Sequence, residues 1–160
     1  NSLHKGIMDV LQQNKEGSQA QDGMDISFCC IDEKTNQIPF SGAKHPIIII
    51  QEEEMQVVKG DPISIGGNSN RLDETNEIKF SQNQISYKQG AMLYMYTDGF
   101  PDQFGGVDNI KFNTERFRNL LMDNHKLPLD DQLDTISKTL VNWVGKHKQL
   151  DDILVMGIKL

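Results

Sequence analysis

An apolar run that stops at a carboxylate constrains this chain more than any other feature of its sequence. Residues 91–96 (AMLYMY) predict a buried strand, and Asp98-Gly99 follows after one residue, with Asp102 in the loop beyond. Asp98 is either a turn residue whose carboxylate bonds nearby backbone amides, or a rigidly held ligand for a hard cation. Taken alone, the segment favours the turn, because Asp-Gly is among the commonest turn dipeptides.

A second acidic pair changes this balance. Asp151-Asp152 opens the apolar run 153–158, so two predicted strands end or begin on carboxylates. Hard cations prefer oxygen ligands, and the coincidence shifts the interpretation towards a metal site. Because adjacent strand residues point to opposite sides, Asp152 is expected to lie beside the metal ligands or to face solvent.

The length and the charge of the chain limit its fold and its partners. The 160 residues, 37% of them hydrophobic, fit one compact domain over 1–160. A formal net charge of −7 argues against nucleic acid and anionic membranes as partners, since both need a basic face. An acidic chain is well suited to binding cations.

Two further features predict a soluble, cytoplasmic domain. Cys29 and Cys30 are neighbours in an apolar run, where a strand points them to opposite faces, so we interpret them as reduced core residues. No run approaches the roughly 18 apolar residues that a membrane span needs. The first residues also lack the basic and apolar pattern of a signal peptide.

Hydrophobic periodicity predicts a β-rich middle and a helical final third. It indicates a short helix over 3–11 and a meander of short antiparallel strands over 24–87, with a polar loop at 69–75. Helices are expected over 114–123, capped by Thr114, and over 129–144, ending near Gly145. The closing run 153–160 is apolar enough to predict a central strand.

Four segments together resemble a known family. They are DGMD at 22–25, SGAKHP at 41–46, YTDG at 96–99 with Asp102, and the closing pair Asp151-Asp152. Their order and the two predicted helices between the last two segments make the match specific. The chain resembles the metal-dependent protein phosphatases (PPM, or type 2C), and more closely their bacterial SpoIIE-like branch, serine phosphatases that act on regulators of sigma factors.

The resemblance implies an α+β fold, an antiparallel β-sandwich flanked by helices, with two Mn²⁺ or Mg²⁺ ions in a complete site. It implies that Asp98 and Asp151 are metal ligands, and that Asp102 matches a position that holds a further, weaker metal in some members. Gly99 belongs to the same Asp-Gly pair, and it joins Asp102 and Asp152 as a candidate for an additional ligand or a residue beside the ligands. Water activated between two cations would then attack a phosphoserine or phosphothreonine phosphorus.

Three residues of the earlier segments allow more than one role. Asp25 lies inside an apolar run, where we favour a turn cap or a bond to a neighbouring strand over metal ligation. Asp22 is equally compatible with either role. His45 lies in a Gly/Pro turn, and we interpret it as a structural hydrogen-bonding residue rather than a catalytic base.

The chain also departs from the family pattern. The Asp-x-x-Gly-His-Gly motif, which supplies a carboxylate that bridges both metals, is absent. We therefore expect an N-terminally truncated domain in which Asp98 and Asp151 form half of the metal site and bind metal weakly. Missing strands would expose sheet edges, which favours pairing of chains as a homodimer.

These expectations converge on a parent protein that is a metal-dependent serine/threonine phosphatase in bacterial signalling, although this isolated chain could be inactive. Its partners would be a phosphoprotein substrate, such as an antagonist of an anti-sigma factor, and sensor or regulatory domains of the same protein. One alternative is a catalytically inactive PPM-fold module that binds or switches. Another is an unrelated acidic β-rich binding domain, in which Asp98 and Asp151 are only turn and strand-end residues.

Overall fold

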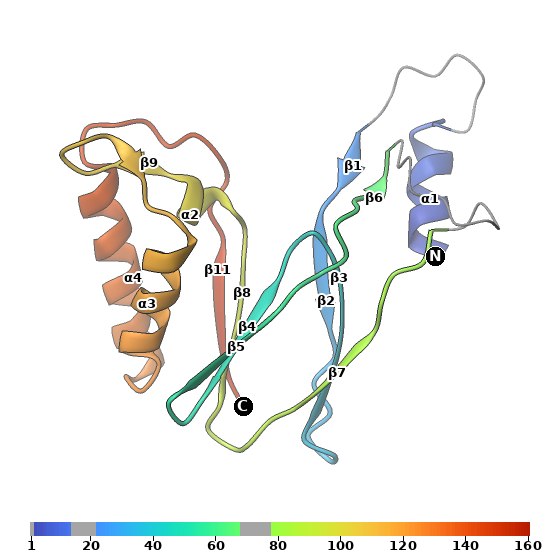
Figure 1. Cartoon of the computed structure of the whole chain (residues 1–160), viewed down its shortest axis with the longest axis horizontal. Helices are drawn as coiled ribbons and strands as arrows, with labels where there is room; N and C mark the ends of the chain where they lie inside the picture. The colour runs from blue at the N-terminus through green and yellow to red at the C-terminus, as the bar shows by residue number, and fades with distance from the viewer. Residues whose placement is uncertain (1, 14–21, 68–77) are drawn as a thin grey trace. The chain divides into compact units, whose positions relative to one another are not determined.

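The computed structural model describes residues 2–13, 22–67 and 78–160, so the loop predicted over 69–75 lies outside the described residues. The described residues group into two compact units (Figure 1). The first unit takes the chain up to Pro46 together with Val58–Ser86, and the second takes Ile47–Val57 and Tyr87–Leu160. Each unit is described by itself.

In the first unit, a short helix is attached to a two-stranded ribbon. Helix α1 (Ser2–Val10) confirms the predicted N-terminal helix, and β1 (Gly23–Met24) pairs antiparallel with β6 (Ile65–Gly66). The Gly66 N–H donates to His4 Nδ1 across 3.0 Å. Partial burial lowers the pKa of His4, which favours the neutral ring that can accept this bond.

The main sheet of this unit has three antiparallel strands in the order β2-β3-β7. They are β2 (Ile26–Cys29), β3 (Gln37–Ala43) and β7 (Asn83–Ser86). Burial alternates along β3, where Ile38 and Phe40 are buried, as expected of a strand with one covered face. Neither cysteine forms a disulfide, but Cys30 is exposed. The prediction of a core residue is wrong for Cys30, because it follows the last residue of β2.

The second unit is built on a four-stranded antiparallel sheet in the order β11-β8-β4-β5. Its strands are β4 (Ile47–Gln51), β5 (Glu54–Val58), β8 (Met92–Tyr96) and β11 (Val155–Lys159). The isoleucines 47–50 are all 0% exposed, so β4 is covered on both faces. β8 is equally central, as its apolar run predicts. β11 lies at an edge of the described sheet, so the prediction of a central closing strand is wrong; Met156 remains 45% exposed.

Helices α3 (Thr114–Asn124) and α4 (Leu129–Val144) confirm the two helices predicted near the C-terminus. They lie side by side in Figure 1 and pack their apolar residues on one core with β4 and β8. Phe117 is central to this core, with its ring centroid 4.7 Å from Tyr96 and 5.0 Å from Phe100. Both ring pairs are tilted, and aromatic contacts at such distances add roughly 0.5–1.5 kcal/mol per pair beyond the burial of the rings.

The helix ends show where the predictions for this region succeed and fail. The cap of α3 is Asn113, whose side chain accepts from the Arg116 N–H across 2.9 Å, so the prediction of Thr114 as the cap is wrong by one residue. α4 does end at Gly145, which has a φ of +54°. Positive φ is favourable for glycine, which explains the stop.

One face of α4 is only partly covered. Leu133 and Val141 are 63% and 68% exposed, although the helical spacing of the apolar residues predicts a buried stripe. A cavity of about 230 Å³ lies between α4 and the sheet, and its lining includes Leu129, Leu133, Ile136, Tyr94 and Val155.

A buried amide fixes the start of α4 to the sheet. Gln132, 4% exposed, accepts from the Tyr94 hydroxyl across 2.6 Å and donates to the carbonyls of Leu127 and His125 across 2.9 and 3.2 Å. Burial raises the pKa of Tyr94 to about 12, so the phenol stays protonated and can donate. The side chain thus joins β8, α4 and the α3–α4 connection.

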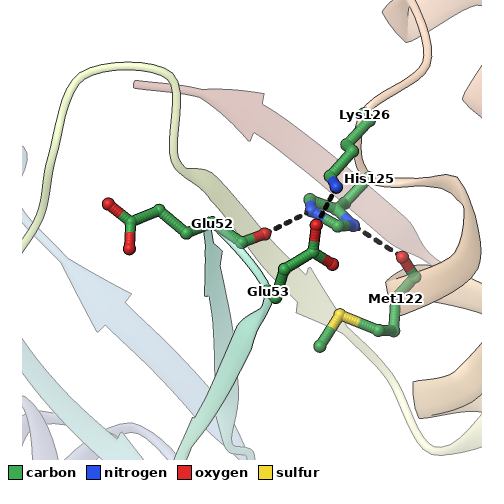
Figure 2. Close-up of polar contacts among 5 residues, drawn as sticks. All are labelled: Glu52, Glu53, Met122, His125 and Lys126. Atoms are coloured by element: carbon green, nitrogen blue, oxygen red, sulfur yellow. Dashed lines mark hydrogen bonds and ion pairs between the residues drawn. The ribbon is translucent and has the colours of Figure 1, made fainter.

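The same connection is attached to the β4–β5 turn by two neighbouring residues (Figure 2). The ring of His125 lies between two carbonyl oxygens, with Nδ1 at 2.5 Å from Met122 and Nε2 at 2.8 Å from Glu52. A neutral imidazole can donate to one of these carbonyls, and an imidazolium can donate to both. Lys126 pairs with Glu53 beside it, and this hydrogen bond lowers the pKa of the Glu53 carboxyl.

We predict that Tyr94→Phe destabilises the protein by about 1–3 kcal/mol at neutral pH, because Gln132 Oε1 stays buried without its donor. Since the folded-state pKa of Tyr94 is above the roughly 10 of an unfolded chain, the native state holds the proton more tightly. This stabilisation is complete below pH 10 and is lost as pH rises to 12.

Urea unfolding of wild type and Tyr94→Phe between pH 8 and pH 12 measures this effect. The other tyrosines are the same in both proteins, so the difference in unfolding free energy isolates Tyr94. We expect that difference to narrow above pH 10, by up to about 2 kcal/mol. Parallel pH profiles would show that the Tyr94 phenol is not held protonated by the fold.

Candidate metal centre

Asp98 lies at the end of a central strand with its carboxylate exposed. β8 ends at Tyr96, and the short helix α2 (Gly99–Asp102) begins directly after Asp98. The Asp98 carbonyl accepts from the Asp102 N–H across 2.9 Å, but its side chain makes no capping hydrogen bond. A turn residue that satisfies nearby amides would use its carboxylate for them, so the turn role does not account for this side chain.

Thr97 extends the pairing of β8 and β11 beyond the ends of both strands. The last paired residues are Tyr96 and Val155. Beyond them, the Thr97 N–H donates to the Leu154 carbonyl across 3.1 Å, and Thr97 Oγ1 accepts from the Leu154 N–H across 2.9 Å. The same hydroxyl donates to the Asp152 carbonyl across 2.8 Å. Thr97 therefore holds the segment that carries Asp98 against the segment that carries Asp152.

The next residue brings the two segments into direct backbone contact. A Cβ on Gly99 would lie 2.4 Å from the Asp152 carbonyl oxygen and 3.0 Å from its carbon, so a larger residue would push the backbone of Asp152 away. Gly99 does not have a positive φ, so backbone conformation does not require glycine here. The close approach of Asp152 does. Gly99 and Asp152, each the second residue of an acidic pair, thus lie in close backbone contact.

Asp151 and Asp152 are both exposed, and they use their polar groups differently. Asp151 Oδ1 accepts from the Asp152 N–H across 2.7 Å, which orients the Asp151 carboxylate. The carbonyl of Asp151 accepts from Gln149 Nε2 across 2.7 Å, while the carbonyl of Asp152 accepts from Thr97.

Asp102 is the acidic residue of α2, and a lysine compensates its charge. Lys111, in β10 (Ile110–Lys111), lies 2.9 Å from Asp102 Oδ2, with both side chains about half exposed. Such exposed pairs contribute less than about 1 kcal/mol, so the contact does not prevent Asp102 from binding another cation.

The three remaining candidates belong to the first unit. The carboxylate of Asp25 accepts from the Ser64 hydroxyl and lies 3.5 Å from Lys44 Nζ. Asp22 is exposed, and its carbonyl accepts from Gln13 Nε2 across 2.6 Å. The backbone of His45 forms a tight turn, with its N–H donating to Ala43 and its carbonyl accepting from Ser27 Oγ across 2.9 Å.

The candidate donors in the second unit are carboxylate oxygens, which suits a hard cation. Magnesium retains several waters and needs only one or two protein carboxylates, which is compatible with Asp98 and Asp151 as the charged donors. Within residues 2–13, 22–67 and 78–160, no group of three or more His, Cys, Asp or Glu side chains converges as in a complete metal cage. Two carboxylates would suit a cation that keeps most of its water ligands rather than one enclosed by protein groups.

Two residues that hold this arrangement together were not recognised from the sequence. Thr97 precedes Asp98, and its role depends on Leu154, far along the chain. Gln103, after α2, is 1% exposed and makes contacts with the chain just before Asp151. A polar residue following an apolar strand and a turn looks like an ordinary loop residue, so no local pattern signals either role.

Comparison with known proteins identifies the family. The model of the Stage II sporulation protein E (SpoIIE) family matches residues 2–160. No curated protein matches the chain.

In the part of the chain that the structure describes, no helix is long and apolar enough to cross a membrane.

Solved structures give the same result. The SiaA-PP2C domain of Pseudomonas aeruginosa matches with a TM-score of 0.84 and 27% identity, over 98% of this chain and 57% of that one. The phosphatase domain of SpoIIE from Bacillus subtilis matches with a TM-score of 0.60 and 17% identity, over 98% and 64%. RsbX in complex with magnesium matches with a TM-score of 0.54 and 16% identity, over 98% and 74%.

The chain spans little more than half the length of the SiaA-PP2C chain that it matches. These likenesses confirm the predicted fold class, the α+β antiparallel sandwich of PP2C phosphatase domains. The family match covers almost every residue, and the chain therefore belongs to the SpoIIE family, with the fold of the PP2C-type phosphatases.

Proposed function

We propose that residues 1–160 form the major part of a single metal-dependent serine/threonine protein phosphatase domain. The observation that carries the proposal is the contact of Gly99 with Asp152, supported by the three hydrogen bonds of Thr97. This contact brings two acidic strand ends together. Membership of the SpoIIE family supports phosphoester hydrolysis as the chemistry that uses them.

In this proposal, Asp98 and Asp151 hold divalent cations, Mn²⁺ or Mg²⁺, two in a complete site. The magnesium complex of RsbX, which shares the fold, supports this choice of metal. When bound, such cations neutralise phosphate charge and make water a stronger nucleophile. Asp102 lies within the same segment and is a candidate for a weaker site, whereas Asp152 contributes through its backbone carbonyl to the positioning of the loop.

The residues of the protein itself would orient the reaction rather than supply a nucleophile. Asp98 follows the end of β8, and Asp151 lies in the segment before β11 that Thr97 ties to β8, so the backbone that carries both carboxylates is held in place by these contacts. Their exposure leaves room for a bulky phosphoprotein. This is consistent with a phosphoserine or phosphothreonine on a protein surface as the substrate.

We further propose that the parent protein acts in bacterial signalling in the cytoplasm. Its substrate would be a phosphorylated regulator, such as an antagonist of an anti-sigma factor, and its activity would be set by regulatory domains of the same protein. The net charge of −7 makes a nucleic-acid partner unfavourable.

We predict that Asp98→Asn and Asp151→Asn each lower Mn²⁺-dependent kcat/KM at least about 100-fold in the full-length protein, because each removes an anionic metal ligand worth several kcal/mol. Turnover of a phosphoserine peptide, with circular dichroism as the check on folding, measures this. Asp108→Asn is the matched control, since Asp108 is an exposed carboxylate in the turn after β9 (Phe104–Gly105).

Wild-type turnover in both variants would contradict the metal assignment. If wild type binds no Mn²⁺ and hydrolyses no phosphoserine peptide, the domain is instead an inactive PPM-fold module that binds or switches. Loss of activity in Asp108→Asn as well would indicate a general effect of surface charge rather than a metal site.

We also predict that Gly99→Ala weakens Mn²⁺ binding by about 10-fold or more, because the new methyl group displaces the Asp152 carbonyl and the adjoining carboxylates. Gly6→Ala is the matched control, since a Cβ on Gly6 in α1 has no atom within 4 Å. Calorimetric titration of Mn²⁺ into both variants makes the comparison. Equal affinity in Gly99→Ala and wild type would show that the close approach is not needed for the site.

A further inference from the structure

We infer that Gln103 is a positioning residue for the metal site, because it binds the residues just before Asp151 and Thr97 binds the residues just after it. The inference rests on the proposed function, since it assigns Gln103 a role towards the same cations. Gln103 lies five residues after Asp98. Its side chain bonds backbone groups rather than either carboxylate, so it would act through the backbone of residues 148–150.

The side chain of Gln103 is buried and fully used. It is 1% exposed, and its Nε2 donates to the carbonyls of Phe104 and Lys148, each across 2.9 Å. Its Oε1 accepts from the Leu150 N–H across 3.4 Å. Both amide hydrogens and the amide oxygen therefore have partners, which is the condition for burying such a group without a large penalty.

The backbone of Gln103 is fixed independently of its side chain. Its carbonyl accepts from the Phe112 N–H across 2.9 Å and from Trp143 Nε1 across 3.0 Å, and its N–H donates to Phe100 across 3.2 Å. Trp143 is held in turn, because a Cβ on Gly105 would lie 1.9 Å from the Trp143 carbonyl oxygen. The amide of Gln103 thus projects from a rigid base.

The segment that Gln103 holds has no regular structure of its own. Residues 145–152 follow α4, precede β11 and are exposed throughout. Gln103 binds this segment at Lys148 and Leu150, whereas Thr97 binds its last residue, Asp152, and also Leu154 just beyond it. Asp151 lies between these two pairs of contacts. Both anchors belong to residues 97–103, the segment that also carries Asp98, so together they determine where Asp151 stands relative to Asp98.

The chain offers a matched control in its other buried glutamine. Gln132 makes an equivalent set of contacts, but to Tyr94, Leu127 and His125, none of which adjoins an acidic strand end. Gln→Met removes the polar atoms at either position and keeps most of the volume. A purely structural role predicts the same consequences at both positions, whereas a positioning role predicts a loss of metal affinity only at Gln103.

The test measures Mn²⁺ affinity in the full-length protein from the electron paramagnetic resonance signal of unbound Mn²⁺, beside thermal unfolding. We expect Gln103→Met to weaken Mn²⁺ binding about 10- to 100-fold, the range seen when residues that orient metal ligands are removed. We expect Gln132→Met to lower the melting temperature with Mn²⁺ affinity within about 2-fold of wild type. Wild-type affinity in a folded Gln103→Met protein would overturn the inference.

Two further measurements separate the possible failures. Asp98→Asn with wild-type Mn²⁺ affinity would overturn the proposed metal site itself, and with it the role of Gln103 towards it. In wild type, the Leu150 amide hydrogen should exchange with solvent at least about 10-fold more slowly than an unstructured amide, because it is bonded to Gln103. Unprotected exchange at Leu150 would overturn the anchoring without any variant, and therefore even if Gln103→Met does not fold.

Discussion

The pairing of β8 with β11, and its extension by Thr97, is the constraint on which the second unit depends. A single hydroxyl accepts from Leu154 and donates to Asp152, so the register of the two strands continues past the last ladder pair. Any slip of one residue would move Thr97 away from both partners and reverse the faces of β11. The contact between the two acidic segments therefore begins from the register of β8 and β11, and side-chain contacts carry it into the irregular residues before β11.

Two buried glutamine side chains hold the irregular segments in place by binding their backbone groups. Gln103 and Gln132 are the buried polar side chains of the described residues, and each joins a loop to a regular element. A hydrophobic side chain could fill either volume but could not satisfy the loop carbonyls and amide hydrogens that these two residues bind. The cost of burying an amide is thereby offset by the backbone groups that it satisfies.

The apolar core gives these contacts a fixed frame. The four isoleucines of β4 and the rings around Phe117 are closely packed, which restricts movement of the strands and of α2. The hydrogen bonds at the ends of these elements therefore keep one geometry. Sites held on strand ends are more precise than sites on loops, which suits a reaction that needs two charges at a set separation. The exposed side of Asp98 and Asp151 is the side that the proposed cations and substrate would approach.

Much of this architecture follows from the sequence alone. The periodicities predicted the N-terminal helix, both C-terminal helices and the strands β4 and β8, because local burial patterns and helix stop signals act within a few residues. The α+β class came from the resemblance to a known family. The Asp-Gly and Asp-Asp pairs likewise marked both acidic strand ends, and four ordered motifs indicated the family. The roles of Asp98, Asp151 and the other acidic candidates as ligands remain predictions.

Only the tertiary structure decided which residues hold those ends together. β11 lies at a sheet edge although its sequence is apolar, because strand order depends on pairing between distant segments. Asn113 rather than Thr114 caps α3, a difference of one residue that composition cannot resolve. Thr97, Gly99 and Gln103 make their decisive contacts with residues 148–154, some fifty positions away, so no local pattern could reveal them. The sequence by itself determined which carboxylates flank the two strands, and the long-range contacts determined that the segments carrying them meet.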